Sequence, residues 1–291
     1  MIPYFEQPSV SFGPVTIHAF GVIVAASVVV AEQLYRQRIR SLRLDTDVAS
    51  GLAWYALIFG FLSAHFFAVL FYFPEKVARD PWSLLRLWED LSSFGGMLGG
   101  AIGAVVFLKL KGSHLSRRQR WGYLDAVAFV VPFGWAVGRL ACAVAHDHPG
   151  RITRFPLAIS LESADARTFI TGQYRASGRP LPQLTTPEGL GFHDLGLYEM
   201  LLLALVLGPL FLLVDRSKIA RTREAGFWVG LFCVCYGAMR IILDTLRIAD
   251  ARYFGLTPGQ YLAIAMLFAG AALLLRSKGS HSEDALQPRP S

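Results

Sequence analysis

Charged residues are scarce in this sequence of 291 residues, of which 17% are charged and 54% are hydrophobic. A soluble globular domain contains about 25% charged residues. The deficit is concentrated in long apolar runs, each close to the roughly 20 residues that cross the hydrocarbon core of a bilayer. The composition therefore excludes an ordinary soluble domain and predicts a membrane protein.

Cysteine is also rare, and the three cysteines of the chain exclude a disulfide framework. Cys142, Cys233 and Cys235 all lie in apolar segments, unlike the cysteines of a small disulfide scaffold. Cys233 and Cys235 are two residues apart and would leave a helix on different faces. We interpret both as lipid-facing or core-facing side chains, and we predict no metal and no cofactor.

The first 13 residues contain no lysine or arginine, so we expect no cleavable signal peptide before the first apolar run. The net charge of +7 would suit a nucleic-acid partner. Most of the positive charge, however, lies in short segments beside apolar runs, which is the pattern of membrane proteins. The sequence therefore predicts a membrane setting and no nucleic-acid partner.

Seven apolar runs predict seven transmembrane helices, because lipid cannot satisfy the polar groups of an irregular backbone. The fold class expected is an all-α polytopic membrane helix bundle. The runs are residues 15–34, 51–73, 94–110, 123–145, 196–214, 226–246 and 257–275.

The loops between these runs differ in charge, and this difference predicts the orientation. Of the 28 lysines and arginines, 16 lie in the loops after the first, third, fifth and seventh runs, and ten lie in the other loops. Basic loops remain in the cytoplasm. We therefore expect an outside N-terminus and a cytoplasmic C-terminus in a bacterial cytoplasmic (inner) membrane.

One long polar segment, residues 146–195, separates the fourth and fifth runs. Loops of this length are often functional, so we expect a small periplasmic cap over the site, with a disordered loop as the alternative. The domains expected are a seven-helix transmembrane domain at 1–275, with this segment inserted, and a disordered cytoplasmic tail at 276–291. No internal repeat supports an inverted-repeat transporter.

A few ionisable residues fall inside the apolar runs, where they are costly and usually functional. Arg139 has no acidic residue within four positions and must find a partner on another helix, a carbonyl or a ligand. Arg240 and Asp244 lie four residues apart and could pair with each other. Two buried arginines also suit an anionic ligand such as a phospholipid head group. The full set is Asp125, Arg139, Glu199, Arg240 and Asp244, with His18 and His65 as weaker members.

Glycines open the third run at four-residue spacing, with Gly95, Gly99 and Gly103 on one helix face. Such spacing is typical of close helix packing in membranes. A phosphate-binding helix start is the alternative interpretation.

Several short motifs occur in the order found in one known family. They are residues 132–140 (PFGWAVGRL) with Gly150 and Arg151; Gly13, Pro14 and 18–21 (HAFG); 70–72 (LFY); 93–96 (SFGG); Asp125; His193 with 197–199 (LYE); 236–244 (YGAMRIILD) with Arg247; and Gly259 with Gln260. On these residues the chain resembles the prolipoprotein diacylglyceryl transferase family over roughly residues 11–275.

The resemblance implies seven spans, an outside N-terminus, a periplasmic cap and a transferase reaction. Such enzymes move the diacylglyceryl group of phosphatidylglycerol onto the lipobox cysteine of a prolipoprotein signal peptide. The expected partners are therefore phosphatidylglycerol or another anionic phospholipid, and that signal peptide. Position by position, the resemblance implies catalytic roles for Arg139, Arg240, Asp147 and Asp244, and substrate binding by Gly95, Gly96, Gly150 and Glu199. We also expect His146 and Cys142, which lie near Arg139 in the sequence, to bind substrate.

The chain departs from the family at four polar positions. Phe94 stands where the family has a histidine considered as the base, Phe20 where it usually has tyrosine, Cys142 where it has asparagine, and His65 where it has arginine. The anion-holding residues are kept, while the residues that would activate a thiol are changed.

Other residues could replace the missing base, namely His146, His148 or Asp147 at the outer end of the fourth run. Alternatively, the two histidines form an exposed loop pair, and Asp147 pairs with Arg151. A nucleophilic Cys142 is a further alternative, although a buried thiol is usually inert.

We weigh three functions: a divergent diacylglyceryl transferase, a catalytically impaired paralogue that binds anionic phospholipid, and a transport or scaffold protein on the same bundle.

Overall fold

The computed structural model describes residues 1–13, 15–87, 91–180, 182, 188–217, 224–248 and 252–279. The chain divides into two compact units, which are described separately below. The first comprises Met1–Ala31, Val131–Leu212 and Ile241–Asp250, and the second comprises Glu32–Val130, Leu213–Arg240 and Ala251–Ser291.

Seven helices within the described residues are long and apolar enough to cross a membrane, as the apolar runs predict. They are α1 (Ala19–Ser41), α2 continued by η1 (Thr46–Phe67 and Ala68–Tyr72), α4 (Ser93–Leu110), α5 (Arg117–Ala145), α7 continued by η3 and α8 (Leu195–Leu202, Leu203–Leu207 and Gly208–Arg216), α10 (Phe227–Asp244) and α11 (Pro258–Gly279). Two short helices, α3 (Pro74–Arg79) and η2 (Pro81–Leu85), follow η1.

The first span begins four residues later than its apolar run predicts. Residues 15–18 form strand β2 (Val15–His18), which pairs antiparallel with β1 (Ser9–Phe12) in a short hairpin. Three of the four β2 residues are β-branched, which favours a strand. The hairpin ends at His18, and α1 follows directly.

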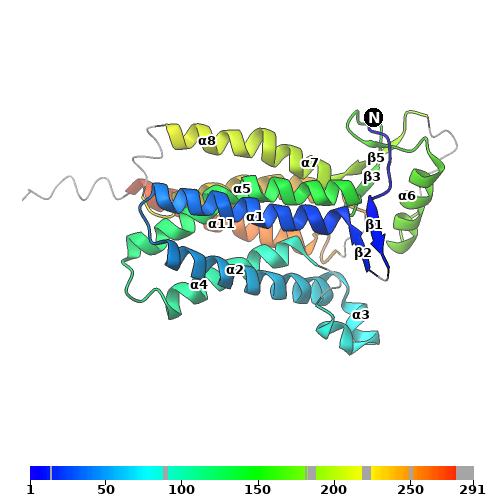
Figure 1. Ribbon diagram of the computed structural model, residues 1–291. Helices are drawn as coiled ribbons and strands as arrows, with labels where there is room; N and C mark the ends of the chain where they lie inside the picture. Colours follow the sequence, from blue (N-terminus) through cyan, green and yellow to red (C-terminus); the bar gives the residue numbers. More distant parts are fainter. Residues whose placement is uncertain are drawn as a thin grey trace, which may run out of the picture. The chain divides into compact units, whose positions relative to one another are not determined.

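A row of glycines brings α2 and α4 close together in the second unit, where the two helices lie side by side (Figure 1). A Cβ on Gly99 would lie 2.3 Å from Ser63 Cβ, and one on Gly103 would lie 2.4 Å from the Tyr55 carbonyl oxygen. Gly95 faces Phe67 in the same way. The packing interpretation of these glycines is therefore confirmed, since a side chain at any of them would force the helices apart.

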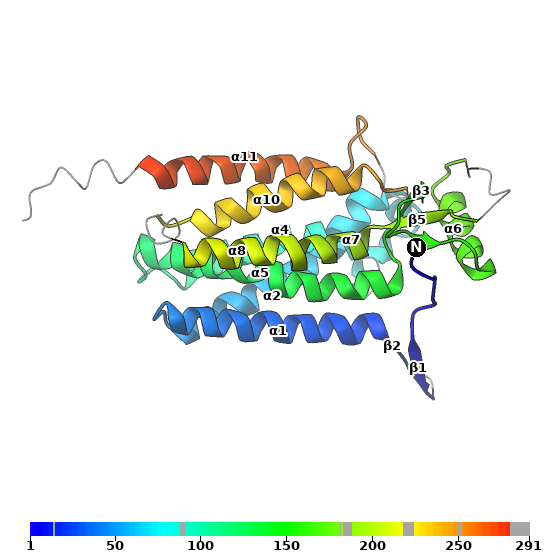
Figure 2. The same cartoon turned by 90° about the horizontal axis from the view of Figure 1, so that it is seen from above.

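Helices α10 and α11 also pack through glycine, and they run side by side in Figure 2. Gly230 lies against the carbonyl oxygen of Gly270, and Gly270 lies against that of Gly230. Asp125 on α5 holds the start of α10, because its two carboxylate oxygens accept hydrogen bonds from the backbone N–H groups of Gly226 (2.7 Å) and Val229 (3.0 Å). Asp125 is thus a helix cap and is buried.

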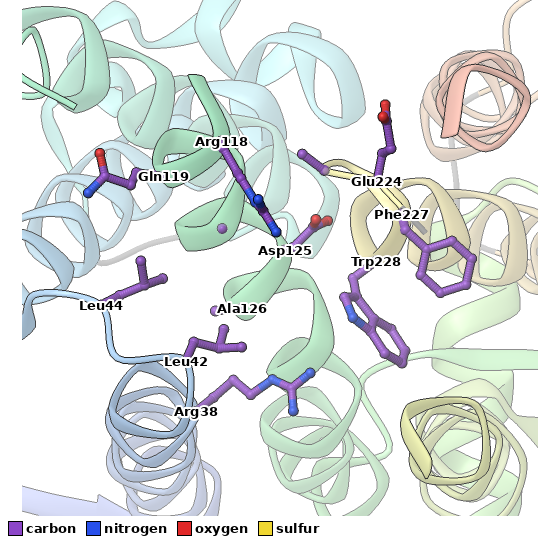
Figure 3. Close-up of a pocket in the computed structure, with 12 residues that line it drawn as sticks. Arg38, Leu42, Leu44, Arg118, Gln119, Asp125, Ala126, Glu224, Phe227 and Trp228 are labelled. Carbon is purple, nitrogen blue, oxygen red and sulfur yellow. The ribbon is translucent and has the colours of Figure 1, made fainter. Parts of the chain in front are cut away.

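Beside this cap, the second unit contains a cavity of about 380 Å³ (Figure 3). Arg38, Arg118, Asp125, Glu224 and Trp228 are among the residues that line it. Arg38 donates two hydrogen bonds to the carboxylate of Asp215, at 3.0 and 2.7 Å, and its guanidinium lies 4.0 Å from the Phe129 ring centre. The charged residues Arg38 and Asp125 in the cavity wall are therefore explained by their contacts with the protein itself.

The segment 146–195 of the first unit contains regular structure. Strands β3 (Pro149–Thr153), β5 (Gly191–Asp194) and β4 (Ile159–Ser160) form an antiparallel sheet in that order, and α6 (Ala164–Ala176) lies beside it (Figure 1). The N-terminus joins the sheet through Ile2, which pairs with Ile159. A small apolar core holds these parts together: Ile159, Leu161, Ala166, Ile170, Tyr174, Phe192 and Ile248.

The last helix is longer than its apolar run predicts. Helix α11 continues to Gly279, so residues 276–279 of the predicted tail are helical. The rest of that tail, 280–291, lies outside the described residues.

We predict that Gly99→Ala destabilises the protein by about 1–3 kcal/mol, since the added Cβ overlaps Ser63 and the Phe59 backbone and overpacking costs about that much. Gly100→Ala is the matched control, because its Cβ would meet only the Ala56 carbonyl oxygen at 3.5 Å. Thermal unfolding in detergent, followed by tryptophan fluorescence, measures both. Equal melting temperatures for the two variants would contradict the packing argument.

Candidate functional site

Arg139 is one of the most deeply buried charged side chains of the first unit, and its partner is Glu199. The guanidinium Nε lies 2.9 Å from Glu199 Oε1, with side-chain exposures of 2% and 1%. Trp135 Nε1 donates to the same carboxylate oxygen at 3.1 Å. The partner on another helix that the sequence required is therefore present, because α5 carries Arg139 and Trp135 while α7 carries Glu199.

Close packing of α5 on α7 positions this ion pair. Gly196, in the first turn of α7, lies against Cys142 and Ala143, where a Cβ would be 2.8 Å from the Cys142 carbonyl carbon. Asp194 caps the same helix, because its Oδ1 accepts a hydrogen bond from the Leu197 N–H at 3.0 Å. The absence of a side chain at Gly196 lets Glu199, one turn later, reach Arg139.

The chain reverses sharply at the end of α5. His146 adopts a left-handed conformation with φ of +50°, which is uncommon for a residue other than glycine. The Asp147 N–H then donates to the Cys142 carbonyl at 3.4 Å, as in a Schellman helix end. This turn folds residues 147 and 148 back over the last turn of the helix.

A polar cluster results from that reversal. One ligand-type atom from each of Cys142, Asp147 and His148 lies within 4.8 Å of the others. His148 Nδ1 contacts Asp147 Oδ1, while Arg139 Nη1 is 3.4 Å from both Cys142 Sγ and His148 Nε2. A thiol, a carboxylate, an imidazole and a guanidinium therefore share one small region.

The charges of Asp147 and His148 stabilise each other. Burial raises the pKa of Asp147, but the charge of His148, its hydrogen bond and the charge of Arg139 bring that pKa below its usual value. Burial lowers the pKa of His148, whereas the Asp147 carboxylate outweighs burial and the opposing charge of Arg247 and raises that pKa to about 9. The pair is thus carboxylate and imidazolium at neutral pH, and a protonated imidazole cannot accept a proton from a thiol.

His146 has a different environment and is almost fully buried, at 2% exposure. Its Nδ1 lies 2.6 Å from Asp194 Oδ2, and the rings of Tyr4, Phe5, Phe169 and Phe192 surround it. The interpretation of His146 and His148 as an exposed loop pair is therefore wrong for His146, while His148 is half-buried. The burial of His146 depends on the N-terminus, α6 and β5, which are distant in sequence.

Gly150 joins strand β3 to the segment after α10. A Cβ there would lie 2.8 Å from His193 Cβ and 2.9 Å from the Leu246 carbonyl oxygen. Arg151 N–H donates to that same carbonyl at 2.9 Å, and Gly150 forms an isolated bridge with Arg247. The contact that the sequence proposed for Asp147 with Arg151 is replaced by the contact of Asp147 with His148.

The remaining predicted site residues lie in α4 and α10. In the second unit, the Arg240 guanidinium lies 4.9 Å from the Phe94 ring centre, and Phe94 stacks with Tyr236. Arg240 and Asp244 on α10 are buried at 3% and 0% exposure. Gly95 and Gly96 face α2, and their substrate-binding role stays a prediction.

His65 is fully buried. Its Nε2 lies 3.1 Å from the Ser83 carbonyl oxygen.

Three neighbours of the site were assigned no role from the sequence: Trp135, Asp194 and Arg247. Asp194 had a usable signal, because aspartate directly before an apolar run is a typical helix N-cap. Trp135 was noted only within the motif at residues 132–140. Arg247 was noted only as part of a motif, and its charge opposes protonation of His148.

We predict that Gly196→Ala loosens the site, because the new Cβ must displace the backbone of α5. The free energy of unfolding should fall by about 1–3 kcal/mol, and Cys142 should react faster with a maleimide in a background with Cys233→Ser and Cys235→Ser. Gly172→Ala on α6 is the control, since no atom lies within 4 Å of its added Cβ. Unchanged Cys142 labelling in Gly196→Ala would argue against this packing.

Comparison with known proteins identifies the family. The prolipoprotein diacylglyceryl transferase family profile matches residues 8–276. Two proteins named phosphatidylglycerol–prolipoprotein diacylglyceryl transferase, from Chromohalobacter salexigens and Shigella boydii, are 28% and 29% identical to this chain. The alignments cover 97% and 94% of this chain, and 96% and 93% of theirs. The chain therefore belongs to the prolipoprotein diacylglyceryl transferase family.

Proposed function

We propose that the protein transfers the diacylglyceryl group of phosphatidylglycerol to the cysteine thiol of a prolipoprotein. The observation that carries this proposal is the buried Arg139, oriented by Glu199 and placed against a cluster with a thiol, a carboxylate and an imidazole. The names of full-length relatives specify the two substrates.

The reaction breaks one bond and forms one. The acceptor thiol loses its proton to water, and its sulfur attacks the glycerol carbon that carries the phosphate. The carbon–oxygen bond breaks, its electron pair stays on the phosphate oxygen, and glycerol phosphate leaves. A thioether remains on the acceptor. The reaction therefore has two requirements. A positively charged group must lie beside the departing phosphate, and the acceptor thiol must be ionised.

Arg139 meets the first requirement. A guanidinium keeps its charge when desolvated and binds phosphate through two parallel hydrogen bonds. Glu199 accepts from Nε and so fixes the plane of the guanidinium. We infer that Asp147 orients groups around this phosphate. Catalytic roles for Arg240 and Asp244 stay predictions of the resemblance.

We infer that the site faces the outer leaflet of a bacterial cytoplasmic membrane. Basic loops predict a cytoplasmic C-terminus, which places the 146–195 segment on the periplasmic side. The prolipoprotein signal peptide would approach beneath this segment, since the cluster lies directly after the end of α5.

A second function is a paralogue that binds anionic phospholipid without transferring it. The observation that favours it is the replacement of expected polar groups by Phe20 and Phe94. Phe94 is 1% exposed and packs against Tyr236, so it can neither accept a proton nor hydrogen-bond a substrate. Arg139 would retain the lipid in either case.

We predict that the chain rescues a bacterium depleted of its own diacylglyceryl transferase, with a diacylglyceryl mass added to lipoprotein cysteines. Arg139→Ala should abolish rescue, and Arg139→Lys should lower transfer by at least about tenfold, because lysine lacks the bidentate fork. Arg175→Ala, on an exposed position of α6, is the control and should rescue. Normal membrane expression without rescue or lipidated product would contradict transfer.

We predict that phosphatidylglycerol co-purifies with the protein and is lost from Arg139→Ala. Glu199→Gln should reduce bound lipid less, because it disorders the guanidinium without removing it. Mass spectrometry of extracted lipid measures this, with Arg175→Ala again as the control. Lipid retention without transfer would favour the binding function, whereas equal lipid content in all variants would remove the phosphate role of Arg139.

A further inference from the structure

His148 brings a second nitrogen to the end of the Arg139 side chain. Its Nδ1 contacts Asp147 Oδ1, and its other ring nitrogen, Nε2, lies 3.4 Å from Arg139 Nη1. The side chains of His148 and Asp147 are 16% and 33% exposed. The His148 carbonyl oxygen accepts a hydrogen bond from the Leu195 N–H at 3.1 Å. The residue is therefore held in place through both its backbone and its ring.

The protonation of His148 decides what its Nε2 and Arg139 Nη1 can bind. A neutral imidazole with its hydrogen on Nδ1 accepts a hydrogen bond through Nε2, whereas an imidazolium carries hydrogen on both nitrogens and accepts none. Burial lowers the pKa of His148, but the Asp147 carboxylate outweighs burial and the charge of Arg247 and raises that pKa to about 9. At neutral pH both nitrogens are therefore donors, and neither can accept from the other.

An oxyanion is the ligand that fits these two donors. Because Nε2 and Nη1 are 3.4 Å apart, an oxygen about 2.9 Å from each, an ordinary N–H···O distance, accepts from both. The charges agree, since Arg139, His148 and Arg247 are three cations against the two carboxylates of Asp147 and Glu199. Donors that carry a positive charge also bind phosphate oxygens more strongly than neutral donors do.

Four ionisable groups surround the His148 ring, and they come from α5, the turn after it and the segment after α10. They are Arg139, Cys142, Asp147 and Arg247. Cys142 Sγ lies 3.4 Å from Arg139 Nη1, but a thiol is only a weak donor and acceptor. Asp147 is the carboxylate among the four, so it is the group that keeps His148 protonated.

We propose that His148 is a second phosphate-binding residue of the transfer site, whose Nε2–H shares one oxygen of the phosphatidylglycerol phosphate with Arg139 Nη1–H. This inference rests on the proposed transfer reaction and deepens it. When the carbon–oxygen bond breaks, its electron pair adds one negative charge to the phosphate, and both donors stabilise that charge. His148 keeps its proton throughout, and the acceptor thiol gives its proton to water. Asp147 is a positioning residue, because it acts through His148.

This role differs from that of a base, which the sequence left open for His148. A base for the acceptor thiol must be neutral before it takes the proton, and the Asp147 carboxylate opposes that state. His148 therefore stabilises the departing phosphate, while ionisation of the thiol is left to the solvent.

The pH dependence of lipid binding tests the proposal in the full-length protein in detergent. Calorimetric titration with short-chain phosphatidylglycerol should give a constant affinity from about pH 6 to 8 and at least about a fivefold loss by about pH 10, as His148 loses its proton. The phosphodiester does not titrate in this range. Asp147→Asn should move this loss to lower pH, because the carboxylate that favours the imidazolium is gone. An affinity that falls at the same pH in both proteins would overturn the proposal.

Two substitutions of His148 separate its charge from its hydrogen bond. His148→Ala should bind phosphatidylglycerol at least about tenfold more weakly at neutral pH. His148→Gln keeps an N–H donor without the charge and should lose less, and neither variant should keep the pH dependence of the wild type. His114→Ala is the matched control, because His114 is exposed on the loop between α4 and α5. Melting temperatures show whether each variant is folded, and wild-type affinity in both His148 variants would contradict the assignment.

The choice of ligand separates a lipid phosphate from free phosphate. Short-chain diacylglycerol has no phosphate and should bind equally to the wild type and to His148→Ala. Phosphatidylglycerol should bind more weakly to His148→Ala. If only the binding of inorganic phosphate depended on His148, the residue would hold a free anion, and its role in lipid binding would be overturned.

Transfer assays separate this inference from the proposed function. Transfer by His148→Ala with an unchanged KM for phosphatidylglycerol would overturn the role of His148 and leave the transferase intact. Lipid binding that depends on His148, in a protein that lipidates no acceptor, would support phosphate binding and overturn the transferase. A KM at least about tenfold higher in His148→Ala, with transfer still measurable at high lipid concentration, supports both.

Discussion

The buried ion pair between Arg139 and Glu199 is the constraint on which the rest of the site depends. A guanidinium removed from water carries a large desolvation cost, which only a close and well-aligned carboxylate offsets. That requirement brings α7 against α5, and Gly196 makes the approach possible by presenting no side chain to Cys142. Because the Arg139 plane is fixed through Nε, its other nitrogens point in a defined direction. The ion pair therefore orients the Arg139 guanidinium more than it stabilises the fold.

The end of α5 is held by a second set of contacts with α7 and the segment before it. Cys142 lies within the last turn of the helix, next to Gly196, and the reversal at His146 is stabilised from outside by Asp194 and by aromatic rings. Asp194 also caps α7 through its other oxygen. One carboxylate therefore couples the start of α7 to the end of α5. The same two helices carry Glu199 and Arg139, so a disturbance at either helix end reaches the site.

The sequence predicted the membrane-spanning helices well and the structure of the 146–195 segment poorly, for a physical reason. Apolar runs identify spans because lipid leaves the backbone no alternative to a helix, and Arg139 required a partner on another helix because no acid lies within its own turns. The burial of His146 could not be read in this way, since its ring is covered by Tyr4, Phe169 and Phe192 from three separate segments. The strand at Val15–His18 was missed because a β-branched apolar run of four residues fits either a helix start or a strand.

The departures from the family differ in kind, and this difference bears on function. The resemblance leads us to expect polar groups at the positions of Phe20 and Phe94, and Phe94 is buried against Tyr236. Cys142 is different, since it adds a thiol beside a carboxylate and an imidazole that already carry opposite charges. The thiol, acid and imidazole at one helix end therefore lie against Arg139 as a mutually paired cluster, and the two proposed functions differ in whether an acceptor thiol is ionised beside it.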